Sequence, residues 1–223
     1  MLVYNISVKF KIVTKFKIMK KLFLGAAIAM SSLTFAQQFG AKAGMNMSSI
    51  SDDGYDDSKS KIGYYAGVFL NAPLAENFSI QPEVLYNNLG SKTTIDMGST
   101  IGKVESTLNL DYISVPVMFQ YNATPQFYLE AGPEFSYLVN AKSKTDVNSV
   151  IGSGTTTREL STDDFNKFNL GLGLGAGFNI TDKIGLNARY VAGFSDVTAP
   201  ESDPSTDANN KNNTFQVGLN LKF

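Results

Sequence analysis

From residue 37 to its last residue, this chain places apolar residues at every second position, in segments of about ten residues. The clearest segment is 168–178, where Phe, Leu and Ala alternate with Asn or Gly. Successive side chains of a β-strand point to opposite faces, so such a segment has one apolar face and one polar or small face. The alternation therefore predicts a chain built from amphipathic strands.

Eight segments carry this pattern, and the chain from Gln37 onward shows no helical period. The expected strands are residues 39–48, 61–71, 78–89, 108–121, 126–141, 167–180, 183–195 and 214–223. About ten residues in a strand tilted by roughly 40° cover about 25 Å, which is the height of the apolar band of a transmembrane barrel. The strands are therefore long enough to cross a membrane.

The connections between these strands alternate in length. Short connections are expected at 72–77, 122–125 and 181–182, and long polar ones at 49–60, 90–107, 142–166 and 196–213. Outer-membrane barrels join their strands by short periplasmic turns and longer extracellular loops, whereas a soluble sandwich has no such alternation. The pattern predicts an all-β fold, an eight-stranded antiparallel up-and-down transmembrane β-barrel, with outer-membrane lipid around it.

Charged residues within the strands fall mostly on the face opposite to the apolar one. The inward set is Lys42, Glu83, Glu130, Glu134 and Arg189. A buried carboxylate is costly unless it is paired, and one arginine can hold carboxylates through paired hydrogen bonds. Because side chains fill the interior of an eight-stranded barrel, we expect a structural cluster. A proton or cation path lined by carboxylates is the functional alternative.

Aromatic residues gather toward both ends of the expected strands. Those nearer the long connections are Tyr64, Tyr86, Tyr112, Tyr137 and Tyr190. Those nearer the short connections or the chain end are Phe69, Phe78, Phe127, Phe178 and Phe223. Aromatic girdles at both membrane interfaces are typical of a spanning barrel, although aromatic residues also favour strands in general. We expect two girdles.

Prolines and glycines interrupt several of these strands. Pro82, Pro116 and Pro133 each remove a donor from the hydrogen-bond ladder, so we expect a bulge or a locally broken ladder at each. Four glycines of the segment 168–178 share the inward face, namely Gly171, Gly173, Gly175 and Gly177. We expect them to make room for larger side chains across the lumen.

The N-terminal region has the composition of a targeting segment. Met19, Lys20 and Lys21 precede the apolar run 22–35, and small residues precede Gln37. A basic start, a short apolar run and small residues at the end define a secretory signal peptide. We expect an upstream extension at 1–18, a signal peptide at 19–36 and a barrel domain at 37–223. A long basic start to the signal and a retained membrane anchor are the alternatives.

Composition argues against several classes of protein. The chain has no Cys, His or Trp, so it has no disulfide and lacks the commonest general base and metal ligand. Of 19 basic and 20 acidic residues, six lysines lie in 1–36, which leaves a formal net charge of −7 from Gln37 onward. Such a surface argues against nucleic acid as a partner. We therefore expect that the protein is not an enzyme and that it has no catalytic residue, no cofactor and no metal site.

Two polar stretches resemble ligand-binding loops only superficially. The acidic cluster 52–57 lacks the ligand spacing and final glutamate of a calcium-binding loop. The Ser-Gly-Thr run 149–157 has no Gly-Lys-Ser/Thr and opens no helix, so it is no phosphate loop. We expect a solvated external loop and the flexible tip of a long loop, respectively.

Several segments together resemble the porin-like outer-membrane β-barrel proteins common in Bacteroidetes, a group that includes the PorT-like barrels. The segments are Phe-Gly-Ala-Lys-Ala-Gly at 39–44, Ser-Ile-Gln-Pro-Glu-Val-Leu-Tyr at 79–86, Tyr-Ile-Ser-Val-Pro-Val at 112–117, Phe-Tyr-Leu-Glu-Ala-Gly-Pro at 127–133, Gly-Leu-Gly-Ala-Gly-Phe at 173–178, Ala-Arg-Tyr at 188–190 and the final Phe223. The resemblance spans the mature chain and includes the prolines.

The resemblance implies an integral outer-membrane barrel without fixing its biochemical role. Family members typically carry Glu where this chain has Ser114, which thins the interior set of carboxylates. Phe223 also resembles the C-terminal signal that barrel-assembly machinery reads, so this machinery is an expected partner during biogenesis.

We expect a non-enzymatic outer-membrane barrel that presents long extracellular loops for binding, adhesion, secretion or assembly, with an extracellular ligand or secretion-system component as partner. The alternatives are porin-like passive transport of solutes and a soluble, lipocalin-like ligand-binding barrel. An outer-membrane hydrolase or acyltransferase is disfavoured because such enzymes usually rely on histidine. The direction of the apolar side chains separates the lipocalin from the membrane barrel.

Overall fold

The computed structural model describes residues 37–51, 58–96, 102–149, 152–197 and 211–223. The expected extension and signal peptide, the acidic cluster 52–57 and most of the connection 196–213 lie outside these ranges. In the described part of the chain, no helix is long and apolar enough to cross a membrane.

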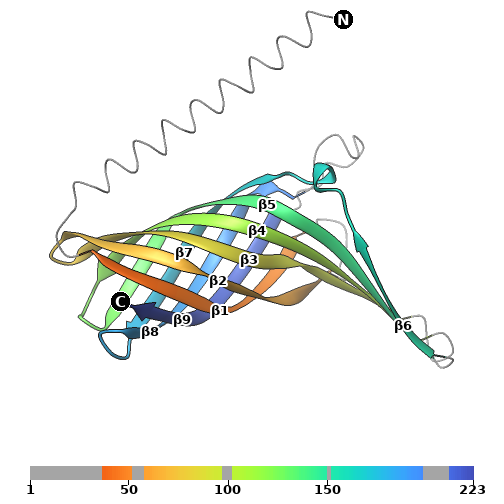
Figure 1. Ribbon diagram of the computed structural model, residues 1–223, viewed down its shortest axis with the longest axis horizontal. Helices are drawn as coiled ribbons and strands as arrows, with labels where there is room; N and C mark the ends of the chain where they lie inside the picture. Colours follow the sequence, from red (N-terminus) through yellow and green to blue (C-terminus); the bar gives the residue numbers. More distant parts are fainter. Residues whose placement is uncertain (1–36, 52–57, 97–101, 150–151, 198–210) are drawn as a thin grey trace, which may run out of the picture. The chain divides into compact units, whose positions relative to one another are not determined.

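Nine antiparallel strands and one short 3₁₀ helix make up the described structure (Figure 1). The elements are β1 Gln38–Ser51, β2 Ser58–Ala75, β3 Phe78–Asp96, β4 Lys103–Asn122, β5 Phe127–Ser149, β6 Gly152–Glu159, η1 Thr162–Asp164, β7 Phe168–Asn179, β8 Ile184–Asp196 and β9 Lys211–Lys222. Eight strands form a closed ring in the order β4, β3, β2, β1, β9, β8, β7 and β5, and β5 pairs with β4 to close it. The predicted eight-stranded up-and-down barrel is therefore confirmed.

The prediction was wrong for two of the long connections, because most of their residues are strand. In 90–107, β3 continues to Asp96 and β4 begins at Lys103, so the two pair as a hairpin. In 142–166, β5 continues to Ser149 and β6 pairs back along it. The supposed loop tip 149–157 is accordingly strand wherever it is described. Apolar alternation could not reveal these extensions, because a sheet solvated on both faces has no apolar face.

The apolar side chains point away from the barrel axis and the charged ones point inward. Leu172, Leu186 and Leu219 are 40%, 46% and 55% exposed, whereas Glu130 and Arg189 are 4% and 1% exposed. A lipocalin needs the opposite arrangement, with an apolar lumen and a polar exterior. The structure therefore excludes the lipocalin alternative.

The outer wall carries most of the expected aromatic girdles, with two corrections. Exposed members are Tyr64, Tyr137, Tyr190, Phe78, Phe127, Phe178 and Phe223. Tyr112 and Phe69, however, are 0% and 3% exposed and face the interior. Both faces of β4 near Tyr112 carry apolar residues, so alternation alone did not reveal its direction.

The β-ladder is interrupted beside the prolines without a change of register. Between β3 and β4, the pair Pro82–Val117 is followed only by Leu85–Ser114. Between β4 and β5, Pro116–Glu134 is followed only by Phe119–Ala131, and Pro133 lies within that gap. Between β2 and β3, Phe69–Glu83 is followed only by Ala72–Ile80, and Pro82 lies within that gap. The three expected ladder breaks are therefore present, on neighbouring pairs of strands.

Candidate functional site in the barrel interior

Four charged side chains meet in the middle of the lumen. Lys42 from β1 donates from Nζ to Glu83 Oε1 on β3 at 3.0 Å. Arg189 from β8 donates from Nη1 and Nη2 to Glu83 Oε2 and Oε1 at 3.0 and 2.8 Å. Its Nε donates to Glu130 Oε1 on β5 at 2.7 Å. These four residues, which we call the ion-pair layer, are at most 4% exposed.

Amide side chains complete the hydrogen bonds of the two carboxylates. Gln81 Nε2 donates to Glu83 Oε1 at 2.8 Å, and Gln120 Nε2 donates to Glu130 Oε2 at 3.1 Å. A buried ion pair needs such additional bonds to offset the loss of hydration of its charges. Gln120 was not predicted as a site residue, although it alternates inward with Ser114 and Met118 on β4.

A second hydrogen-bonded chain crosses the lumen beside the ion-pair layer. Tyr65 Oη donates to Asn187 Oδ1 at 2.9 Å, and Asn187 Nδ2 donates to Asn220 Oδ1 at 2.8 Å. Asn220 Nδ2 donates in turn to Tyr128 Oη at 3.1 Å. These residues come from β2, β8, β9 and β5, so the chain ties distant parts of the ring together. None of the four was predicted as a site residue, although their inward parity was a signal that could have revealed them.

Glu134 does not join the ion-pair layer, although it belongs to the predicted inward set. It is 4% exposed, and Ser136 Oγ donates to its Oε1 at 3.3 Å. No cation of the described chain lies within ion-pair distance of its carboxylate. Ser136 also shares a 2.7 Å hydrogen bond with Ser114, the position where the resemblance implies Glu. The structure thus brings four of the five predicted residues together and places Glu134 one layer away.

The glycines of β7 make room for these lumen side chains. A Cβ atom on Gly173 would lie 2.6 Å from Met118 Cε, and one on Gly177 would lie 2.1 Å from Tyr128 Cζ. A Cβ on Gly175 would lie 3.0 Å from Glu130 Oε1. Real Cβ atoms do not approach other atoms below about 3.0 Å. The inward glycine face therefore makes room for large lumen side chains, as predicted. Two of them, however, come from the adjacent strand β5, where Glu130 pairs with Gly175 and Tyr128 with Gly177, and not from across the lumen.

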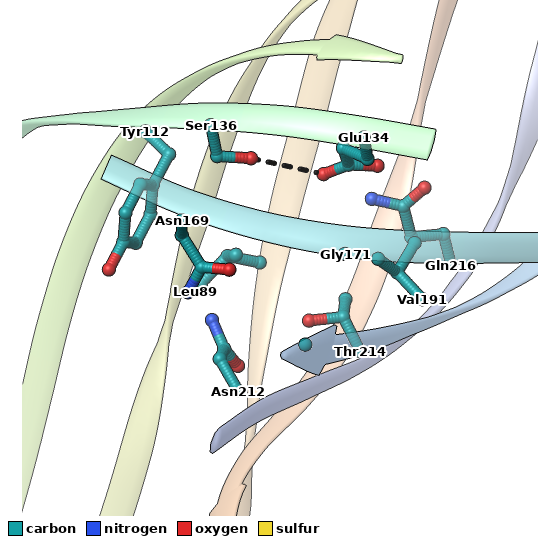
Figure 2. A pocket seen from close by; sticks show the side chains of 11 residues that line it. Leu89, Tyr112, Glu134, Ser136, Asn169, Gly171, Val191, Asn212, Thr214 and Gln216 are labelled. Atoms are coloured by element: carbon teal, nitrogen blue, oxygen red, sulfur yellow. Dashed lines mark hydrogen bonds between the residues drawn. The ribbon is translucent and has the colours of Figure 1, made fainter. Parts of the chain in front are cut away.

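Polar cavities lie on both sides of the ion-pair layer. Toward the short connections, a vestibule with about 230 Å³ of space for water-sized particles is lined largely by amides, including Asn71, Gln120 and Asn220. Toward the long connections, a much smaller chamber is lined by Glu134, Ser136 and other residues (Figure 2). The ion-pair layer separates the two cavities.

An apolar cluster fills part of the lumen beyond this chamber. Its members are Leu89, Leu110, Tyr112, Leu138, Ala141 and Val197, with Ile50, Leu108, Leu160 and Phe165 packed against them. Leu160 and Phe165 flank η1, and Leu160 N donates to Ala141 O at 3.0 Å. The chain after β6 is therefore packed against this cluster, which we call the apolar cap.

Phe223 lies at the opposite end of the barrel. Its backbone N donates to Phe39 O at 2.8 Å, which continues the pairing of β9 with β1. The side chain is 77% exposed on the outer wall. This placement leaves the aromatic ring accessible, and its role in assembly stays a prediction.

The closed ring, the apolar outer wall and the polar interior define an integral outer-membrane β-barrel. The family model of the outer membrane protein beta-barrel domain matches residues 35–199. The chain therefore belongs to that family, and it resides in the bacterial outer membrane with lipid against its outer wall.

Solved structures of bacterial outer-membrane proteins are similar to this chain. Ail, the attachment invasion locus protein of Yersinia pestis, is 15% identical with a TM-score of 0.49, covering 85% of this chain and 100% of that chain. Neisserial surface protein A is 13% identical with a TM-score of 0.49, covering 84% and 99%. OprG from Pseudomonas aeruginosa is 15% identical with a TM-score of 0.40, covering 84% and 96%. No curated protein matches the chain.

Proposed function

We propose that the protein is a non-enzymatic barrel whose projecting sheet binds an extended segment of an extracellular partner protein. The sheet consists of the ends of β3, β4 and β5, together with β6, and it extends beyond the barrel wall (Figure 1). The long connections of outer-membrane barrels face the outside of the cell. The sheet is accordingly positioned to meet partners outside the cell.

The free edge of β6 is the observation that carries this proposal. All eight residues of β6 are exposed, and in the described structure β6 pairs with β5 alone. An unpaired strand edge presents a row of backbone donors and acceptors that an added strand can pair with. The partner's backbone would supply most of the affinity, and its side chains would meet the Ser and Thr residues of β6.

The edge is held in place chiefly by strand pairing. The pairs between β5 and β6 run from Lys142–Glu159 to Ser149–Gly152. Thr155 Oγ1 donates to Asp146 Oδ1 at 2.6 Å, and this bond lowers the pKa of the exposed Asp146 carboxyl. The ion pair between Lys142 and Glu159 spans 3.3 Å at the surface, where such pairs contribute little. The projecting sheet is therefore ordered yet open to solvent.

The test removes the edge and leaves the barrel intact. Residues 145–156 and 94–105 are each replaced by Asn-Gly, because this dipeptide joins two antiparallel strands tightly. Lys144 is paired with Thr157 and Thr93 with Ser106, and removal of 145–156 alone would leave residues 103–106 of β4 as a new free edge. Cells carrying the shortened chain should lose attachment to the eukaryotic cells, bacteria or surfaces that cells with the full chain bind. A T155A/T157A variant, which keeps the backbone edge, should retain attachment. Attachment that survives the deletion contradicts the proposal.

Passive transport is the second candidate, and the polar vestibule favours it. The vestibule ends at the ion-pair layer, however, and the apolar cap fills part of the lumen beyond it, so we propose that no solute passes. Single-channel recordings of the purified full chain in planar bilayers test this directly. We expect no stable conductance; a steady open channel would establish transport instead.

We also propose the finer features that the family resemblance implies. The segments that resemble PorT-like barrels support placement of the chain in the Bacteroidetes branch of porin-like proteins. The exposed Phe223 at the end of the β9–β1 seam supports recognition by barrel-assembly machinery, as does its resemblance to the signal that this machinery reads.

A further inference from the structure

The two faces of the projecting sheet differ in charge. Its inner face continues the side of the lumen wall that carries Leu110 and Ala141, because alternate residues of a strand share a face. Its outer face carries six charged residues that form three ion pairs, Lys92 with Glu105, Lys142 with Glu159, and Lys144 with Asp146. The charges of the outer face are therefore already paired within the chain.

The inner face is uncharged except on its edge strand. Across β4, β5 and β6 its successive rows are Leu108, Ser143 and Arg158; Ser106, Thr145 and Thr156; and Val104, Val147 and Gly154. Arg158 is the one charged residue of these rows, and no acidic side chain in the described part of the chain lies within ion-pair distance of it. A strand added to β6 would therefore place a side chain beside a cation that has no partner.

Gly154 leaves a gap in the same edge. A Cβ atom there would have nothing within 4 Å, and Val147, its neighbour on β5, is 39% exposed. Val147 pairs in turn with Val104 on β4, so two apolar residues stand behind the gap. An added strand would lie roughly 10 Å from β5, two strand spacings away, and an aromatic side chain spans more of this distance than a short one. Aromatic side chains opposite edge glycines stabilise sheets in this way.

We propose that the segment bound along β6 carries an acidic residue opposite Arg158 and an aromatic residue opposite Gly154. This inference rests on the proposed edge binding and states the chemistry of the partner that fits it. Arg158 and Gly154 are four positions apart on one face, so the partner's two residues are four positions apart as well. Antiparallel pairing is the more stable arrangement, and in it the acidic residue precedes the aromatic one. These two contacts select a sequence, whereas backbone hydrogen bonds to β6 do not.

The experiment measures the binding of fluorescent peptides to the full chain in lipid nanodiscs by anisotropy. The parent peptide is a run of threonines that contains a glutamate and, four positions later, a phenylalanine. Lysine in place of the glutamate, or serine in place of the phenylalanine, should weaken binding roughly threefold to tenfold. The parent sequence in reverse order should also bind more weakly. Equal affinities for the four peptides overturn the proposal, as does a lack of binding.

Variants assign the two contacts. Arg158→Glu should bind the lysine peptide more tightly than the glutamate peptide, which reverses the preference. Lys144→Glu, the same change of charge on the outer face, is the matched control and should keep the preference for glutamate. Gly154→Thr fills the gap and should remove the preference for phenylalanine over serine, while the preference for glutamate remains. A preference that survives the variant designed to remove it contradicts the assigned contact.

The shortened chain separates this inference from the proposed function. Peptides that bind the full chain and not the shortened one, but without a preference among sequences, rule out the acidic and aromatic pattern and leave edge binding standing. Equal binding of the parent peptide to both chains means that it does not use the edge, which also rules out the pattern. The proposed function fails on a different result, namely attachment of cells that survives the shortening.

Discussion

Arg189 on β8 and Glu83 on β3 form a two-point ion pair across the full width of the lumen, at 2.8 and 3.0 Å. Three strands separate β3 from β8 in either direction around the ring. A bidentate arginine–carboxylate pair is the strongest geometry of its kind. This pair therefore fastens opposite walls of the barrel through its centre.

Removal of Arg189 should destabilise the barrel strongly. Arg189→Met leaves the Glu83 and Glu130 carboxylates buried with one cation, Lys42, between them, and breaking such a pair costs about 3–5 kcal/mol. Urea unfolding in detergent micelles measures the loss. Arg158→Met on exposed β6 is the matched control and should change stability by less than about 0.5 kcal/mol.

The coupling within this pair is separately measurable. The double variant Arg189→Met/Glu83→Gln should lose less unfolding free energy than the two single variants lose in sum. The reason is that Glu83→Gln removes a charge that Arg189→Met has left unpaired. Additive losses would show that Arg189 acts through packing alone.

A methyl group on the glycine face of β7 should meet the lumen side chains. Gly177→Ala places a Cβ about 2.1 Å from Tyr128 Cζ, and overpacking of this kind costs about 1–3 kcal/mol. Gly154→Ala, where nothing lies within 4 Å of the added Cβ, is the control and should be neutral or slightly stabilising. Tyr128→Leu in the Gly177→Ala chain should recover part of the loss. The midpoints of urea unfolding report all three effects.

A positive charge on the outer wall should reveal where hydrocarbon lies. Leu174 is 55% exposed and pairs with Tyr190 in the middle of the β7–β8 ladder. Leu174→Arg should lower the unfolding free energy in lipid vesicles by about 2–4 kcal/mol, as expected for a charge near the midplane of the bilayer. Val147→Arg, on the part of β5 that pairs with β6 outside the ring, should be near neutral. Similar costs at both positions would contradict the placement of the membrane.

Loss of the final aromatic residue should impair assembly more than stability. Deletion of Phe223 removes one backbone bond to Phe39 and the exposed ring that we propose is recognised during biogenesis. We expect less folded, heat-modifiable protein in the outer membrane of cells. Protein refolded from urea into micelles should differ little from wild type. Normal levels in cells would remove the proposed role of Phe223.

The local sequence reveals the parity of each strand, that is, which of its side chains face lipid and which face the lumen. The alternation around Leu172, Leu186 and Leu219 set which side chains meet lipid, because a strand can turn only one face to each side. The same parity identified Arg189 and Glu130 as interior residues, and the glycine face of 168–178 as space for larger lumen side chains. The exceptions, Tyr112 and Phe69, lie in strands where both faces carry apolar residues.

Which inward side chains meet was decided by ring closure alone. The sequence places Glu130 and Glu134 on the same face of one strand, but only the stagger of β8 against β5 and β3 brings Arg189 to Glu130 and Glu83 and leaves Glu134 apart. The projecting sheet likewise depends on β5 changing partner from β7 to β6. Periodicity records the environment of each residue; partners across a barrel are fixed by the register of all eight strands together, which no single segment encodes.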